Sequence, residues 1–344
     1  MTNPDKKFGN RNSNFELLRI VAMLMIVIGH LYKFWDNSAV SQEKGIIYPW
    51  FLTNQGVDIF ILISGIFGIN VSIKKYVSLW LTIVYYGFIC AVILWLCLDK
   101  PISILLTMPL REGLVIPSHL WFVSTYFALM VFSPLINTLF TKSKVTQFYY
   151  CILFLGVDVV FQTRTPLFYG LTTWGGSLLH FIALYVLGRI VFLWKIKMPL
   201  ILVIGVYLIS VVLGFFMWDN ALYSGKDTSI WIILPSLCLI FICKDTKSFY
   251  NRLINHIAQA SFGVYCFHAL LISLISIIIN PILSQIFMRM GNAGVTLISC
   301  GISILIYLIT LPVDSLRRWI NNMIESYLLR IIDSVNIRIT KIIS

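Results

Sequence analysis

The sequence predicts an all-α integral membrane protein, a polytopic bundle of about ten transmembrane helices. Two features of its composition predict this fold class: 59% of the 344 residues are hydrophobic and only 12% are charged, whereas soluble domains carry about 25% charged residues. The third observation is the length of the apolar runs. Residues 77–98 contain no charged side chain, and a helix of about 20 residues crosses the hydrocarbon core of a bilayer.

Ten apolar runs separated by polar or basic breaks are the candidate membrane spans. They cover residues 15–34, 51–70, 77–98, 119–140, 146–163, 177–194, 199–217, 230–243, 256–280 and 294–312. Residues 99–118 form the longest predicted outer loop, which is expected to pack back against the membrane. Residues 316–344 repeat apolar residues at helical spacing among basic ones, which predicts an amphipathic helix on the inner membrane surface; a frayed tail is the alternative. We expect one domain over residues 1–344, with its core at about residues 14–315.

The placement of basic residues predicts the orientation of the bundle. If the spans alternate, 19 of the 26 lysine and arginine residues fall on the same side as the amino terminus. The positive-inside rule then places both termini in the cytoplasm. The net charge of +12 sits in short clusters between apolar runs, a pattern typical of contact with anionic lipid and not with nucleic acid. The seven cysteines lie within apolar runs and form no CxxC pair, so we expect packing residues and no metal site.

The first apolar run carries two polar side chains that need an explanation. Arg19 and His30 are eleven residues apart, which is three helical turns plus about 20°, so they share one helix face about 16 Å apart along the axis. Arg19 is predicted at the inner end and His30 at the outer end. Each residue also has a purely structural explanation. Glu16 is placed to pair with Arg19, and His30 fits an ordinary interfacial residue.

Asp58 is an acid inside the second apolar run, at a depth similar to that of His30. A buried carboxylate in hydrocarbon is costly without a partner, and an aspartate that fixes a histidine tautomer is a recurrent way to make a base. We therefore predict a His30–Asp58 pair. The alternatives are a pair with Lys33 or a cap on a bent helix. Ser64, Gly65 and Gly68 follow in the same run and are predicted to allow close helix packing.

Four more side chains lie in short motifs near or within the spans. His119 and Trp121 belong to HLWFV at the outer start of the fourth run, where an aromatic-belt role is the simplest reading of the tryptophan. Tyr265 and His268 lie three residues apart in SFGVYCFH, on one helix face. No Walker loop, Rossmann fingerprint, HExxH helix or GxSxG elbow is present in the sequence, so ATP-driven transport by this chain alone is not expected.

Four of these segments occur in a fixed order: the Arg19–His30 face, GVDIFILISGIFG, HLWFV and SFGVYCFH. Together they resemble the membrane acyltransferase-3 family, integral membrane acyltransferases of surface polysaccharides, over about residues 14–315. The resemblance implies a ten-helix bundle in the cell membrane. It also implies that an acyl group, commonly acetyl, passes from coenzyme A at the cytoplasmic side to a glycan hydroxyl at the outer face. Acyl-CoA is then a co-substrate, with no permanently bound cofactor.

The resemblance also implies a set of site residues. Family motif residues carry over to Arg19, His30, Asp58, Ser64, Gly65, His119, Leu120, Trp121, Ser261, Tyr265 and His268. We expect catalytic roles for His30, Asp58 and Arg19. The acyl-CoA phosphates are expected to bind Arg19, Lys74, Lys75 and Arg189, although many relatives have more arginine where this chain has Lys74 and Lys75. The acceptor or oxyanion candidates are His119, Trp121, Tyr265 and His268.

The sequence leaves several alternatives open. His30 fits either a general base or an acyl carrier. A transporter or flippase of a glycan or lipid-linked sugar also needs many spans and polar residues within them, but the chain has no paired halves with matching broken helices. A structural scaffold leaves Arg19, His30 and Asp58 unexplained. Capsule, cell-wall glycan, exopolysaccharide and a lipid-linked sugar all fit as acceptors, with acetyl or a longer acyl group, and no oligomeric state is predicted.

Overall fold

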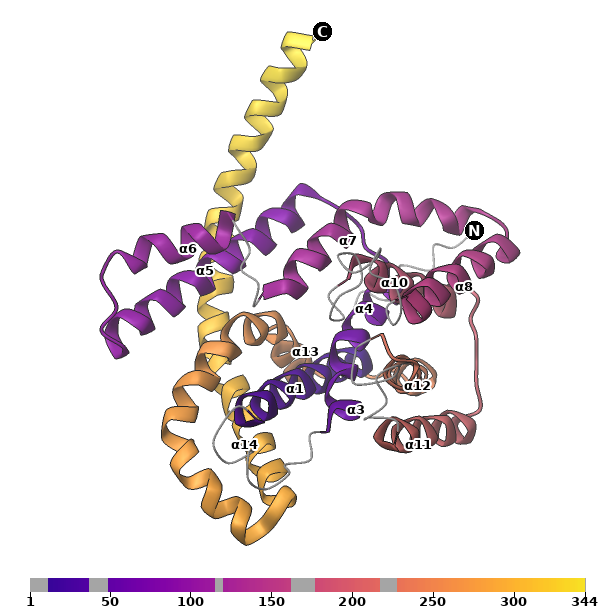
Figure 1. The fold of residues 1–344 in the computed structure, drawn as a ribbon. Coiled ribbons are helices and arrows are strands. Elements are labelled where there is room, and N and C mark those ends of the chain that lie inside the picture. Colours follow the sequence, from indigo (N-terminus) through magenta and orange to yellow (C-terminus); the bar gives the residue numbers. More distant parts are fainter. Residues whose placement is uncertain (1–11, 37–48, 115–119, 162–176, 217–227, 344) are drawn as a thin grey trace.

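A computed structural model describes residues 12–36, 49–114, 120–161, 177–216 and 228–343, and the secondary structure of these residues is helical (Figure 1). Within the described residues, every predicted apolar run overlaps helical residues, and the last two runs fall mainly in the single element α14. The helices are α1 (Ser13–Asp36), α3 (Trp50–Thr53), α4 (Gln55–Phe67), α5 (Ile73–Cys97), α6 (Ile104–Leu114), α7 (Trp121–Asn137), α8 (Lys144–Phe161), α10 (Leu178–Leu193), α11 (Leu200–Phe216), α12 (Ile230–Asp245), α13 (Arg252–Ala258) and α14 (Ser261–Ile343), with a 3-10 turn at Thr138–Thr141.

Five helical segments among the described residues are long and apolar enough to cross a membrane. They are Ser13–Trp35, Ile73–Cys97, Trp121–Thr141, Ser261–Asn280 and Arg289–Ile324. Three shorter apolar helices are Phe51–Phe67, Leu178–Leu193 and Leu200–Phe216. The all-helical membrane architecture is thus confirmed, while the count of ten spans and the cytoplasmic placement of both termini stay predictions.

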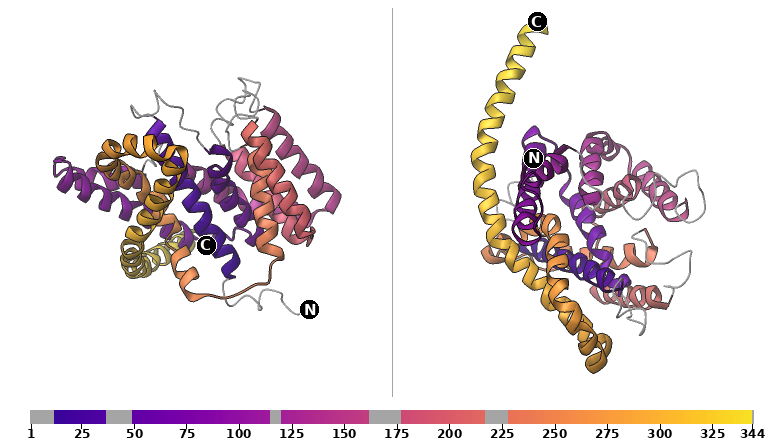
Figure 2. Two further views of the ribbon diagram at one scale, coloured as in Figure 1. Left: turned by 90° about the horizontal axis from the view of Figure 1, so that it is seen from below. Right: turned by 60° about the vertical axis from the view of Figure 1, so that its left-hand side comes forward.

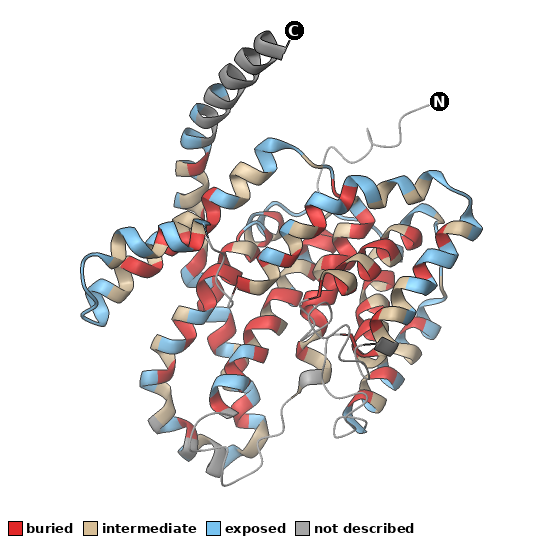
Figure 3. Cartoon of the chain, turned by 45° about the horizontal axis from the view of Figure 1, so that its top comes forward, coloured by how far each residue is buried: buried red, intermediate tan, exposed pale blue. Residues whose placement is uncertain are grey.

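Helix α4 lies between α1 and α10 and touches each through a glycine. A Cβ atom on Gly56 would lie 2.5 Å from the Ala22 carbonyl oxygen of α1, and one on Gly65 would lie 2.3 Å from the Tyr185 carbonyl oxygen of α10. Nine residues separate these glycines, which is half a turn beyond two full turns. One face of α4 therefore packs on α1 and the opposite face on α10. Figure 3 shows buried residues concentrated in the middle of the molecule.

The predicted outer loop at residues 99–118 contains helix α6, which packs back along α5. The Trp80 indole N–H of α5 donates a hydrogen bond of 2.9 Å to the Gly113 carbonyl oxygen. Gly87 of α5 leaves room for the Glu112 carboxylate, since a Cβ atom there would lie 2.8 Å from Oε2. The segment thus folds back as a helix against α5, and the α5–α6 hairpin projects from the bundle in Figure 1.

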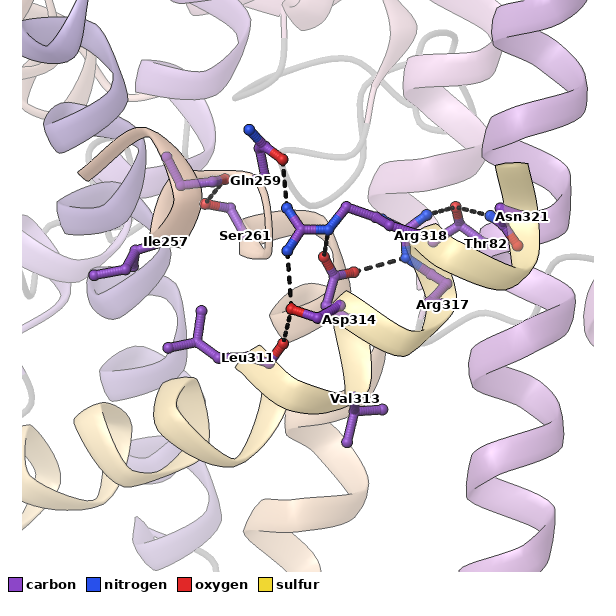
Figure 4. A network of polar contacts seen from close by, with 12 residues as sticks. Thr82, Ile257, Gln259, Ser261, Leu311, Val313, Asp314, Arg317, Arg318 and Asn321 are labelled. Atoms are coloured by element: carbon purple, nitrogen blue, oxygen red, sulfur yellow. Dashed lines mark hydrogen bonds and ion pairs between the residues drawn. The ribbon is translucent and has the colours of Figure 1, made fainter. Parts of the chain in front are cut away.

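A buried ionic network attaches this hairpin to α14 (Figure 4). The fully buried Asp314 carboxylate accepts a hydrogen bond of 2.7 Å from Arg317 Nε and one of 3.2 Å from the Tyr86 hydroxyl of α5. It also pairs with Arg318 Nε at 3.4 Å. Arg317 in turn donates to the Thr82 hydroxyl of α5 at 2.8 Å. A carboxylate with several charged and neutral donors of this kind holds α5 and α14 together.

Helix α14 is broken once and then continues through the predicted tail. The break lies at Gly291, whose φ of 58° is a backbone conformation that glycine adopts without steric cost. Beyond it the helix runs to Ile343 and away from the bundle (Figure 2). The helical character expected for residues 316–344 is therefore present up to Ile343, and its contact with the membrane surface stays a prediction.

The close approach of α4 and α10 predicts strong sensitivity at Gly188. A Cβ atom there would lie 2.4 Å from the Leu62 carbonyl oxygen, so Gly188→Ala forces the helices apart and should lower the free energy of unfolding by about 1–3 kcal/mol. Gly205→Ala on α11 is the matched control, because nothing lies within 4 Å of its Cβ position. Thermal unfolding in detergent should show a lower melting temperature for Gly188→Ala only; equal values would contradict this packing.

Glu112 gives the α5–α6 hairpin a pH dependence. Burial raises the pKa of its carboxyl from 4.5 to about 7, against a smaller lowering by Arg111. The folded state therefore holds a proton that the unfolded state loses above about pH 4.5. This contribution to stability is present at low pH and is lost as the pH rises through about 7.

Glu112→Gln should remove that pH dependence. The variant should match the wild type in melting temperature near pH 4, and should become more stable than the wild type by pH 8, because neutral glutamine has no charge to desolvate. Asp99→Asn, which neutralises an exposed acid, should leave the wild-type profile unchanged. A Glu112→Gln profile parallel to that of the wild type would show that Glu112 ionises alike in both states.

Candidate active site

His30 lies near the C-terminal end of α1 with one ring nitrogen occupied by its own helix. Its Nδ1 is 2.8 Å from the Ile26 carbonyl oxygen. A carbonyl oxygen only accepts, so Nδ1 carries the hydrogen and Nε2 is the basic nitrogen of the neutral ring. The side chain is exposed although its neighbours Leu31 and Tyr32 are buried. A base of fixed tautomer is therefore accessible at this end of α1.

A second histidine packs against it. The rings of His30 and His268 are 4.8 Å apart with an interplanar angle of 71°, an edge-to-face contact between α1 and α14. His268 is buried, and its Nδ1 lies 2.6 Å from the Tyr265 carbonyl oxygen, one turn earlier in α14. The Tyr265 hydroxyl accepts a hydrogen bond of 3.2 Å from the Phe122 backbone N–H at the start of α7. Three sequence-predicted residues, His30, Tyr265 and His268, thus come together.

The predicted pair between His30 and Asp58 is wrong. Asp58 is fully buried and its Oδ1 lies 3.0 Å from Nε2 of His180, in the first turn of α10. The other ring nitrogen of His180, Nδ1, lies 2.6 Å from Oδ2 of Asp158, near the end of α8. The partner that fixes the His30 tautomer is the Ile26 backbone instead, which needs no second helix.

The geometry of α4 explains this error. Gly56 packs on α1, and Asp58 follows by two residues, which is about 200° around a helix. Asp58 therefore points away from α1. It shares a face with Gly65, seven residues later, and that face packs on α10. The depth of Asp58 along the helix was a poor guide because the direction of the side chain depends on which face meets which neighbour.

Asp58, His180 and Asp158 form a triad that must share protons. Each ring nitrogen of His180 faces a carboxylate oxygen, and the neutral ring has only one N–H. The second contact therefore needs a proton on the ring or on a carboxyl group. All three side chains are fully buried, so this cluster joins α4, α8 and α10 through groups that are costly to leave without partners.

Sequence reasoning placed His180 near the outer end of the sixth run but gave neither His180 nor Asp158 a role, although a signal was present. Asp158 is an acid inside the apolar run 146–163, and a charge there requires a partner. His180 lies in the first turn of the next run, on the far side of a single connection. Asp58, Asp158 and His180 all lie near the predicted outer ends of their spans, and this shared depth was the available evidence that they could meet.

Two of the predicted cationic residues, Arg19 and Arg189, both lie near the C-terminal end of α4. Arg19 pairs with Glu16 at 2.7 Å, as the local alternative predicted, and its guanidinium lies 5.7 Å from the centre of the Phe67 ring. Arg189 of α10 donates a hydrogen bond of 3.2 Å to the Ile66 carbonyl oxygen. Its guanidinium packs on Gly68, where a Cβ atom would lie 2.9 Å from it. Two arginines from different helices thus flank residues 66–68.

The other predicted residues are placed less centrally. Lys74 and Lys75 are exposed at the start of α5, and Lys75 Nζ donates to the Asn70 carbonyl oxygen. Trp121 packs on Phe181 with ring centres 6.3 Å apart. His119 lies outside the described residues. Among the described residues, no group of three histidine, cysteine or acidic side chains is placed to hold a metal ion.

A comparison with protein-family models decides the family. The model described as an acyltransferase domain, that of acyltransferase-3, matches residues 12–311. The chain belongs to the acyltransferase-3 family. It is therefore a membrane acyltransferase. No curated protein and no solved structure gives a significant match. The matched range of this acyltransferase contains both histidines, both arginines and the Asp58–His180–Asp158 triad.

The triad predicts that His180 is required for folding of the acyltransferase. His180→Leu leaves two buried carboxyl groups without their shared donor, and removing one member of a buried ionic group costs about 3–5 kcal/mol. We expect a large loss of melting temperature and of folded yield in detergent. His256→Leu changes an exposed histidine and should be nearly neutral. Wild-type stability of His180→Leu would show that the triad contributes little.

Proposed function

We propose that this acyltransferase moves an acyl group, acetyl in the simplest case, from cytoplasmic acyl-CoA to a hydroxyl of an extracytoplasmic polysaccharide or glycan. The observation that carries the proposal is the environment of His30. Its Nδ1–H is donated to Ile26, so a basic Nε2 is presented at one end of α1, while arginines gather at the other. The membrane in question is the cell membrane, and the acyl group crosses within the bundle.

The arginine end suits the phosphates of the donor. Arg19 and Arg189 come from α1 and α10 and flank the same end of α4, and guanidinium groups bind phosphate oxygens through forked hydrogen bonds. Lys74 and Lys75 lie seven and eight residues beyond Phe67 on the chain and add positive charge at the start of α5. With phosphates held there, the pantetheine arm would run along α1 toward His30, over about 16 Å at 1.5 Å per residue.

The histidine end suits the acyl transfer step. His30 Nε2 serves as a base on the acceptor hydroxyl or as the atom that carries the acyl group. The developing oxyanion needs a donor. Tyr265 is suited to this role because it carries an O–H donor and packs on the His268 ring, with ring centres 5.7 Å apart. Trp121 N–H and His119 are the other oxyanion or acceptor candidates. Asp58 acts through the triad on helix positions and not on His30.

The proposal predicts that transfer depends on Nε2 of His30. His30→Asn keeps a donor near the position of Nδ1 for the Ile26 carbonyl and lacks the basic nitrogen, and His30→Ala lacks both. Loss of a general base or nucleophile lowers the rate by about 10²–10⁴-fold. Labelled acetyl from acetyl-CoA should enter surface glycan in membranes with the wild type and not with either variant, at equal protein levels. A fully active His30→Asn enzyme would overturn the proposal.

A further inference from the structure

The contact between His30 and His268 joins two bases that differ in access. Both rings donate Nδ1–H to a carbonyl oxygen of their own helix, Ile26 for His30 and Tyr265 for His268. In the neutral state both therefore have Nε2 as the basic nitrogen. His30 is exposed, whereas His268 is only 3% exposed. His30 can be reached directly, and the buried His268 ring is in contact with it.

If the acyl group passes directly from coenzyme A to the acceptor, one basic residue is enough. If it is first carried by His30, a second basic residue is needed. If Nε2 of His30 carries the acyl group, its lone pair is bonded to carbon and cannot accept the proton of the attacking hydroxyl. A second basic nitrogen must then lie beside the acyl group. Because the His268 ring packs against the His30 ring at 4.8 Å, Nε2 of His268 is the candidate for this second base.

We propose that His268 is a second catalytic base, which accepts the proton of the acceptor hydroxyl while His30 carries the acyl group. This inference rests on the proposed function. It revises the expected role of His268, because a neutral ring whose Nδ1–H is held by a carbonyl offers a lone pair at Nε2 and no hydrogen for an oxyanion.

The two steps balance. In the first, the lone pair of His30 Nε2 attacks the thioester carbonyl carbon, the C–S bond breaks, and coenzyme A leaves as a thiolate that takes a proton from water. His30 is then an N-acylimidazolium whose Nδ1–H stays on Ile26. In the second, the acceptor oxygen attacks the acyl carbon and its proton passes to His268 Nε2. The C–N bond breaks, its electron pair returns to His30, and His268 releases the proton to water.

Trapping the acyl-enzyme tests this division of roles. The full chain in lipid nanodiscs is mixed with labelled acetyl-CoA and then chased with glycerol as a simple alcohol. His268→Asn retains an amide donor for the Tyr265 carbonyl and lacks Nε2. It should form labelled protein as the wild type does, and should lose the label to glycerol at least about 100-fold more slowly. His30→Asn should give no labelled protein, and His256→Asn, at an exposed site, should match the wild type.

The outcomes separate this inference from the proposed function. A wild type that consumes no acetyl-CoA with glycan or glycerol would overturn the function itself. A wild type that transfers acetyl while His268→Asn is chased at the normal rate would overturn only the role of His268. If His268→Asn does not fold, His268→Gln, which also lacks a basic nitrogen, is chased in its place, and loss of label to glycerol at the wild-type rate would overturn the inference.

Discussion

The fold of the site depends on the position of α4 between two helices at backbone contact distance. Gly56 admits the Ala22 carbonyl oxygen of α1, and Gly65 admits the Tyr185 carbonyl oxygen of α10 on the opposite face. A side chain at either position would separate the helices, and closely packed interiors do not absorb such a change locally. The register of both neighbours relative to α4 is therefore fixed by two glycines. Every polar contact described around α4 follows from that register.

This arrangement separates the polar residues around α4 into an accessible group on the α1 side and a buried group on the α10 side. On the α1 side, His30 has its tautomer set by its own helix and is exposed beside His268. On the α10 side, Asp58 is buried against His180 and Asp158. A catalytic group must be accessible to substrate, whereas a buried polar group that joins helices needs hydrogen-bond partners for its polar atoms and is shielded from water. The ring of Phe122 on α7 lies 5.4 Å from Phe181 on α10 and 5.4 Å from Tyr265 on α14, so aromatic packing connects the two sides.

A second buried acidic cluster, around Asp314, includes residues beyond the range of the family match. Asp314 lies just beyond residue 311, where the match ends, yet it binds Arg317, Arg318 and Tyr86. It attaches the α5–α6 hairpin to α14 much as the triad attaches α8 to α4 and α10. In both clusters an acid that is expensive to bury is retained where helices distant in sequence meet, α4, α8 and α10 in the triad and α5 and α14 at Asp314, which suits a contact that specifies one arrangement.

The sequence alone determined the helical membrane architecture, because the length and position of apolar runs follow from the thickness of a bilayer and the rise of a helix. It also singled out Arg19, His30 and Asp58 as candidates, since costly polar residues within apolar runs are visible in one dimension, and the family resemblance added Tyr265 and His268. Only the tertiary structure decided which of them meet. The partner of Asp58 is His180, 122 residues away, because the face that each helix turns to its neighbours is set by backbone contacts at Gly56 and Gly65, and depth along a helix carries no information about that direction.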